Sequence, residues 1–194
     1  EVTTAGSGTA VQGQDQMIAL RFTDVRIPQG AALTEAKLVL TPKAAPATPL
    51  ASTWRVRAEQ ADDSAPLENT PSNISSRPAD GASVNWAIDN TTLTTVETDP
   101  TTGIEAGDPE ESVDIRSVLQ SVIDRSGWCG GNAMTILLDT TSADVNQTRF
   151  LHSHDSSTSH APKLVYKFSA GATGCVKAKE TAQTGISGDD AEQS

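Results

Sequence analysis

Short runs in which apolar and polar residues alternate are the feature that most constrains the fold of this 194-residue chain. The clearest run, residues 54–59, reads Trp-Arg-Val-Arg-Ala-Glu. Successive side chains of a strand point to opposite faces, so this pattern predicts a strand with one buried face and one exposed face. Further strands are predicted at 17–22, 36–40, 84–86, 148–151 and 163–168, with a buried strand at 133–138 and an edge strand near Val96.

One segment, residues 112–126, has helical rather than strand periodicity. Its apolar residues recur at i, i+3, i+4, i+7 and i+8, which predicts an amphipathic helix near 114–126. Ser112 or Asp114 is expected to cap its start, and Gly127 to end it. Many short strands, long polar loops and one helix together predict an all-β fold, a two-sheet antiparallel β-sandwich of jelly-roll-like type.

Length and composition agree with one domain plus a tail. We expect an N-terminal extension or first strand at 1–15, a sandwich module at 16–175, and a linker or tail at 176–194. The alternative for 176–194 is the start of a following module. The net charge is −11, and no run of basic residues is present. This excludes a conventional nucleic-acid-binding protein, which needs lysine and arginine against phosphate, and argues against attachment to anionic membranes.

The two cysteines, Cys129 and Cys175, predict a single disulfide in an oxidising compartment. Two free thiols in a cytosolic protein are the alternative. The bridge would close 46 residue steps (175 minus 129), which the chain-entropy treatment equates with about 4 kcal/mol of stability. The chain starts at Glu1 without a signal peptide, so we expect a processed chain or a fragment of a longer one.

Several stretches resemble, in the same order, bacterial extracellular β-sandwich modules of surface proteins and of the PilY/PilC family of type IV pilus tip adhesins. More distantly, the chain is similar to DNRLRE-type and carbohydrate-binding jelly rolls. The most specific part is WCGGNAM, at 128–134, followed by a strand and a distal Gly-Cys pair. The other matching stretches are LRFTDVRIPQGAALTEAKLVLTP (20–42), EQADDSAPLENTPSNISSRP (59–78), SVNW (83–86) and HAPKLVYKF (160–168).

The resemblance implies export from a bacterial cell, an adhesive, stalk or filament role, and no catalytic residues. It also suggests that the tail could begin a second copy of the module, because such modules often follow an element like Asp189-Asp190-Ala191-Glu192. The expected partners are therefore other subunits or modules of the same surface assembly.

The long polar region after Glu59 is the candidate site for a calcium ion. Glu59, Asp62, Asp63 and Asn73 offer side-chain oxygens, and calcium takes six to eight oxygen ligands. No Asp-x-Asp-x-Asp-Gly pattern is present. The alternative is a solvated acidic loop whose aspartates and asparagine serve turns.

A histidine-rich segment is a second candidate metal site. If His152 and His154 lie on a strand, both imidazoles share a face, and Asp155 or His160 can supply a third zinc ligand. The alternative is a polar strand end with solvent-facing histidines.

The three tryptophans bear on carbohydrate binding, because sugars stack on exposed aromatic faces. Trp54 and Trp86 are in phase with buried positions, and Trp128 lies beside Cys129, so we expect all three in the core. No Gly-x-Ser-x-Gly, His-Glu-x-x-His or P-loop motif is present. The sequence therefore predicts a noncatalytic extracellular structural or adhesive module; the alternative is a carbohydrate-binding module of a secreted enzyme.

Overall fold

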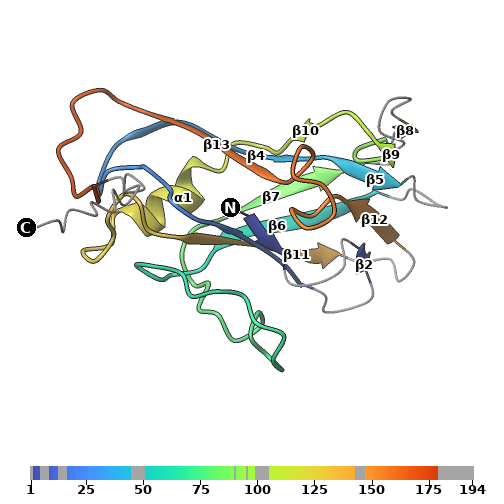
Figure 1. Cartoon of the computed structure of the whole chain (residues 1–194), viewed down its shortest axis with the longest axis horizontal. Helices are drawn as coiled ribbons and strands as arrows, with labels where there is room; N and C mark the ends of the chain where they lie inside the picture. The colour runs from blue at the N-terminus through green and yellow to red at the C-terminus, as the bar shows by residue number, and fades with distance from the viewer. Residues whose placement is uncertain are drawn as a thin grey trace, which may run out of the picture.

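The computed structural model describes residues 2–4, 9–12, 17–44, 51–89, 91–94, 96–98, 105–142 and 147–178. Antiparallel strands dominate it, with one short helix, so the expected all-β sandwich is confirmed (Figure 1). The elements are β1 (Val2–Thr4), β2 (Thr9–Gln12), β3 (Met17–Phe22), β4 (Leu33–Leu40), β5 (Pro42–Ala44), β6 (Ser52–Ala58), β7 (Ser83–Ile88), β8 (Glu97–Thr98), β9 (Glu105–Ala106), β10 (Glu110–Glu111), α1 (Arg116–Ile123), β11 (Met134–Ser142), β12 (Gln147–Leu151) and β13 (Lys163–Phe168).

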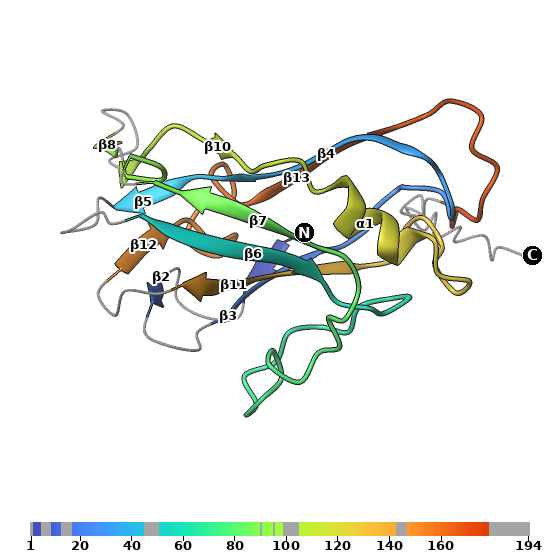
Figure 2. The same cartoon turned by 180° about the vertical axis from the view of Figure 1, so that it is seen from behind.

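The strands form two main layers. One is a five-stranded sheet in the order β1-β3-β11-β6-β7, and the layer above it contains a three-stranded sheet, β10-β4-β13 (Figure 1 and Figure 2). A second three-stranded sheet, β2-β12-β5, and the pair β8-β9 lie at the end of the molecule opposite α1. Every pairing between these strands is antiparallel.

The alternation in the sequence determines which side of each strand faces the core. On β6, Trp54, Val56 and Ala58 are buried, and Trp54 lies directly opposite Trp86 of β7. The two indoles meet edge to face, with ring centroids 5.8 Å apart. Such cross-strand aromatic pairs stabilise a sheet beyond the area that they bury.

The helix is confirmed but spans only Arg116–Ile123. Val118, Leu119, Val122 and Ile123 are fully buried, and this stripe packs against β4, β6 and β7. The expected cap by Ser112 is wrong, because its hydroxyl accepts the amide of Leu38. The N-cap residue is Ile115, and Asp114 lies one position before it and accepts the amide of Arg116 at 2.9 Å. The C-cap residue is Asp124, so the helix ends before Gly127.

A disulfide joins Cys129 and Cys175, as the cysteine count predicted. The segment expected as an extension or first strand contains β1, which pairs with β3, and β2, which pairs with β12. The expected edge strand near Val96 corresponds to β8, and residues 179–194 of the expected tail lie outside the described residues. Within the described ranges, no helix has the length and apolar character needed to cross a membrane.

Candidate functional site

The long loop between β6 and β7, residues 59–82, is attached to the five-stranded sheet near its start. The amide of Glu59 donates to Thr135 at 2.9 Å, and that of Ser64 donates to Ala133 at 2.9 Å. The amide of Gln60 reaches Pro78 on the returning limb at 2.7 Å. The loop leaves the sheet where β6 ends and β7 begins, and hangs beneath it (Figure 2).

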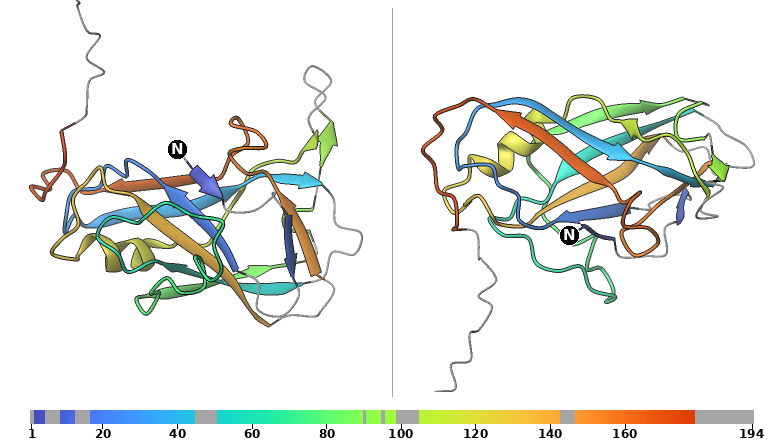
Figure 3. Two further views of the ribbon diagram at one scale, coloured as in Figure 1. Left: turned by 60° about the horizontal axis from the view of Figure 1, so that its bottom comes forward. Right: turned by 45° about the horizontal axis from the view of Figure 1, so that its top comes forward.

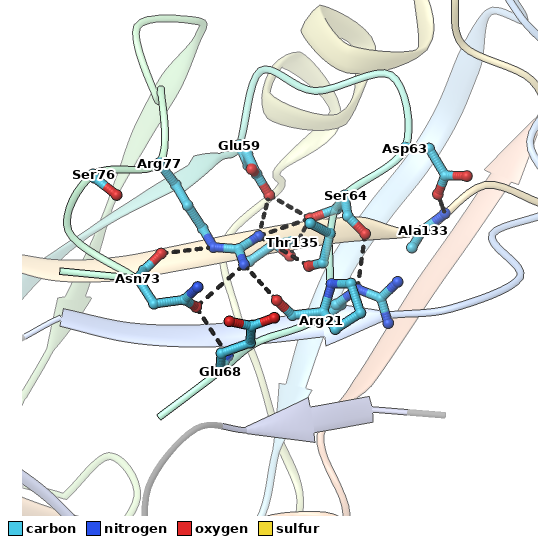
Figure 4. A network of polar contacts seen from close by, with 12 residues as sticks. Arg21, Glu59, Asp63, Ser64, Glu68, Asn73, Ser76, Arg77, Ala133 and Thr135 are labelled. Carbon is cyan, nitrogen blue, oxygen red and sulfur yellow. Dashed lines mark hydrogen bonds and ion pairs between the residues drawn. The ribbon is translucent and has the colours of Figure 1, made fainter. Parts of the chain in front are cut away.

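Arg77 joins the two limbs of this loop. Its guanidinium donates to the Glu59 carboxylate at 2.7 Å, and both side chains are more than nine-tenths buried. It also donates to the carbonyls of Ala65 at 3.1 Å, Pro66 at 2.8 Å and Asn73 at 3.0 Å (Figure 4). A single side chain therefore satisfies backbone acceptors that the polar loop would otherwise leave unpaired.

Ser64 connects this network to the sheet beneath. Its hydroxyl contacts the Glu59 carboxylate and lies 2.5 Å from the hydroxyl of Thr135 on β11. Its carbonyl accepts the side chain of Arg21 on β3 at 2.9 Å. Ser64 and Thr135 are almost completely buried, so this hydroxyl–carboxylate cluster lies away from solvent (Figure 4).

The residues predicted to bind calcium are engaged with other groups. Glu59 pairs with Arg77, Asp62 with Arg125 at 2.6 Å, and Asp63 with Lys177 at 3.2 Å. In the described parts of the chain, no group of three or more histidine, cysteine, aspartate or glutamate side chains converges as metal ligands do. Calcium binding stays a prediction, and a calorimetric titration with calcium tests it.

The side chain of Asn73, the fourth residue of that set, binds within the loop. Its carbonyl oxygen accepts the amide of Glu68 at 3.0 Å and lies 3.3 Å from the Arg77 guanidinium. An amide that closes a turn in this way is the alternative that the sequence had left open.

The histidine segment begins only after β12 ends at Leu151, so His152 and His154 do not share a strand face. Instead, the ring of His152 stacks on that of His160, with centroids 5.1 Å apart. The Nδ1 atoms lie within hydrogen-bond distance of Ser156 and Ser157, respectively. His154 faces Asp155 at 3.6 Å, so the four proposed zinc ligands separate into two pairs.

All three tryptophans lie in the core, as expected. Trp54, Trp86 and Trp128 are at most 4% exposed, and the indole of Trp128 donates to the carbonyl of Ile27 at 2.9 Å. None of the three presents a ring face on which a sugar can stack.

The segment after β13 is clamped beside the disulfide. Gly130 donates to Cys175 at 2.9 Å, Lys177 donates to Gly130 at 2.6 Å, and Gln29 donates to Cys175 at 3.3 Å. Gly174 passes so close to Gln29 that an added Cβ would lie 1.9 Å from the Gln29 carbonyl oxygen. The chain therefore leaves the domain through covalent and hydrogen-bonded contacts to two loops, 25–30 and 128–131.

No family model matches the chain, and no curated protein matches it. The resemblance to pilus-tip and surface-protein modules therefore rests on the quoted sequence stretches.

Sequence reasoning missed Arg77, Arg21 and Thr135. Arg77 is the one basic residue in the loop, which is the only sequence signal that pointed to it. Arg21 falls on the polar side of a predicted strand, and Thr135 falls within a predicted buried strand. Their contacts with Ser64 depend on a loop that folds over the sheet.

Asp89, at the end of β7, supports a separate prediction about acid stability. One of its carboxylate oxygens accepts the hydroxyl and amide of Thr91 and of Thr92, all within 2.9 Å. These bonds, that of the Thr91 hydroxyl first, hold the pKa of Asp89 well below its ordinary value of 3.8. Because the pKa of this carboxyl is lower in the folded state than in the unfolded state, its ionised form stabilises the folded protein at pH values above the ordinary pKa. This stabilisation is lost as the pH falls below the ordinary pKa.

We therefore expect Asp89→Asn to flatten the pH dependence of unfolding below about pH 4. Urea denaturation of both proteins between pH 2 and pH 7, a range chosen around that value, measures the difference. Parallel curves for the two proteins over the acidic range would contradict the assignment.

Proposed function

We propose that this protein is a noncatalytic structural or adhesive module of an extracellular bacterial assembly, a building unit of a pilus, a filament or a large surface adhesin. The observation that carries the proposal is the clamped exit at Cys175. The disulfide to Cys129 and the neighbouring hydrogen bonds hold the segment 172–178 against loops 25–30 and 128–131. If a partner pulls on the chain beyond this segment, the pulling force acts on the disulfide before it acts on β13.

The polar groups of the 59–82 loop support the same interpretation. Glu59, Ser64, Thr135 and Arg77 are buried against one another, and they hold the loop to the sheet. A catalytic acid or nucleophile must reach a substrate. Beyond this network, most residues of the segment 65–72 are exposed, which offers a surface for contact with a partner.

The alternative, a carbohydrate-binding module, has less support from the tryptophans. A sugar that stacked on an aromatic face would need a residue other than Trp54, Trp86 or Trp128, because these are buried. Binding to a glycan array would favour this alternative over the structural one.

The proposal is tested by locating the chain in its native setting. Antibodies raised against this protein are expected to label a filament or the outer surface of intact bacterial cells in immunogold electron microscopy. Label confined to the cytoplasm or periplasm of sectioned cells, with none on the surface, would overturn it. Antibody against a known surface filament and one against a cytoplasmic protein serve as controls.

A further inference from the structure

The strand β7 forms an open edge of the five-stranded sheet. It pairs with β6 on one side, and no strand in the described part of the chain pairs with its other side. Figure 3 shows β7, in green, running beside β6, in teal, at one margin of the sheet. A strand at the edge of a sheet presents unpaired peptide groups, and a further strand can pair with these groups.

The ladder between β6 and β11 determines which peptide groups of β7 face this open edge. The amide of Glu59 donates to Thr135 at 2.9 Å and continues that ladder, so the odd-numbered residues of β6 bond towards β11. Because opposed residues of an antiparallel pair alternate between bonded and non-bonded, the even-numbered residues of β6 bond towards β7. These residues pair with even-numbered residues of β7. The residues of β7 whose peptide groups point away from the sheet are therefore Ser83, Asn85 and Ala87.

The edge of β7 lacks the features that prevent pairing with other chains. Edge strands usually carry charged side chains, proline or a bulge for this purpose. The six residues of β7 include no charged residue and no proline, and their register with β6 is unbroken. The edge strand of equal length in the other layer, β13, instead carries Lys163 and Lys167, and its register with β4 shifts after Lys167. Of these two edges, β7 is the one that is open to a further strand.

The side chains of β7 combine a fixed strand with an accessible edge. Trp86 and Ile88 are buried in the core and hold the strand in place. Ser83, Asn85 and Ala87 are exposed on the outer face, and their side chains are short. A further strand can therefore approach the peptide groups without moving a large side chain, and it would cover the partly buried Val84.

Charge favours this edge as the place where two copies of the chain meet. Each copy carries −11, so two copies repel each other over most of their surfaces. No residue between Asp80 and Asp89 is charged, and this uncharged stretch contains the whole of β7. Two copies can therefore bring these strands together without opposing two like charges on them.

Two copies of β7 are complementary when they pair antiparallel about a two-fold axis at Asn85. This register places Asn85 opposite Asn85 of the second copy, and Ser83 opposite Ala87. All the outward peptide groups of these three residues then have a partner, as in any antiparallel ladder. The two Asn85 side chains can also bond each other, because an amide both donates and accepts. On the inner face, Val84 of each copy lies opposite Trp86 of the other.

We propose that two copies of this protein join edge to edge through β7, so that their five-stranded sheets become one continuous antiparallel sheet. The contact is isologous, because the same residues of both copies form it. One strand pair is small beside a standard interface, so we expect weak association. This inference rests on the proposed function as an assembly unit and specifies the surface through which two units join.

Cysteine cross-linking tests the register in the full chain. Asn85→Cys is expected to give a disulfide-linked dimer under mild oxidation, because opposed residues of a bonded antiparallel pair have Cα atoms about 5.5 Å apart. Ser83→Cys and Ala87→Cys are matched controls on the same strand, and each alone should give at least about tenfold less dimer, since neither faces itself. A mixture of these two variants should cross-link, because Ser83 faces Ala87. Peptide mapping verifies that the bridge between Cys129 and Cys175 stays intact.

Sedimentation equilibrium tests the contact without an added cysteine. The wild type, at concentrations up to about 1 mM, is expected to form a dimer that strengthens as salt is raised. Salt screens the repulsion between two copies that each carry −11. Asn85→Lys should weaken the dimer at least about tenfold, because two ammonium groups then face each other, although the variant reduces the overall negative charge. Val165→Lys makes the same change of charge on β13 and should leave the dimer at least as strong.

A wild type that stays monomeric over this range of concentration and salt would overturn the contact. Equal cross-linking of the three cysteine variants alone would overturn the register. Weakening by Val165→Lys but not by Asn85→Lys would assign the association to β13 and overturn the role of β7. If Asn85→Lys unfolds, as circular dichroism would reveal, the cysteine variants still decide the question. Surface labelling in the immunogold experiment does not depend on the oligomeric state, so the two proposals can fail separately.

Discussion

Replacing Arg77 by alanine is expected to lower the free energy of unfolding by about 3–5 kcal/mol. The substitution leaves the Glu59 carboxylate buried without its cation, and removing one partner of a buried pair is far more costly than losing an exposed pair. It also leaves the carbonyls of Ala65 and Pro66 without their donor. Urea denaturation followed by circular dichroism measures the loss.

Two further variants separate the causes. Arg77→Met keeps an apolar stem like that of arginine. The difference in the free energy of unfolding between Arg77→Met and Arg77→Ala therefore reports the packing of that stem alone. Combining Arg77→Met with Glu59→Gln removes both charges and should recover a large part of the stability, because no uncompensated charge stays buried. A double variant no more stable than Arg77→Met would show that the Glu59 charge is not the cause.

Arg116→Ala supplies the matched control. Arg116 pairs with Asp114 at 2.6 Å, but both side chains are about half exposed. Exposed pairs contribute at most about 1 kcal/mol, because water screens them and their side chains lose entropy when they pair. A loss as large as that of Arg77→Ala would contradict the importance that we assign to burial.

Replacing both cysteines by serine is expected to lower the free energy of unfolding by about 4 kcal/mol. The bridge closes 46 residue steps and so restricts the unfolded chain. The loss should be accompanied by faster amide exchange at Gly130 and Lys177, whose hydrogen bonds hold the exit segment beside the bridge.

The wild type treated with a reductant serves as the control for the serine variant. Both should show the same shift in the denaturation midpoint, since both lack the same covalent link. Equal stability of the oxidised and reduced wild type would show that the bridge constrains little of the unfolded chain. Unchanged exchange at Gly130 and Lys177 would show that the hydrogen bonds alone hold the exit.

The site was predicted less completely than the fold, and particular residues show the reason. The residues around Glu59 attracted attention as calcium ligands because acidic side chains clustered in one loop. The pairings of Asp62 with Arg125 and of Asp63 with Lys177 join residues 63 and 114 positions apart. Periodicity in a sequence carries no information on pairings at such separations, because it reports only which side of an element is buried.

The contacts of the histidines also depend on the tertiary structure, over a shorter stretch of the chain. The pairing of His152 with His154 required β12 to continue past Leu151, and the strand ends there. The turn that follows brings His160 back onto His152. Strand ends depend on where a partner strand stops, and β5, the partner here, pairs no further than Leu151.

By itself, the sequence determined the strand faces, the helix and the disulfide. Alternation along 54–59 and the helical spacing within 112–126 reflect the burial of one face, a local property that each segment carries within it. Because the chain has two cysteines, only one disulfide pairing within it is possible. Only the tertiary structure decided that Arg77 is buried against Glu59, that the arginines of β3 and β6 share one face, and that the exit is held between two loops. Each of these depends on segments distant in the chain, and chain topology alone brings them together.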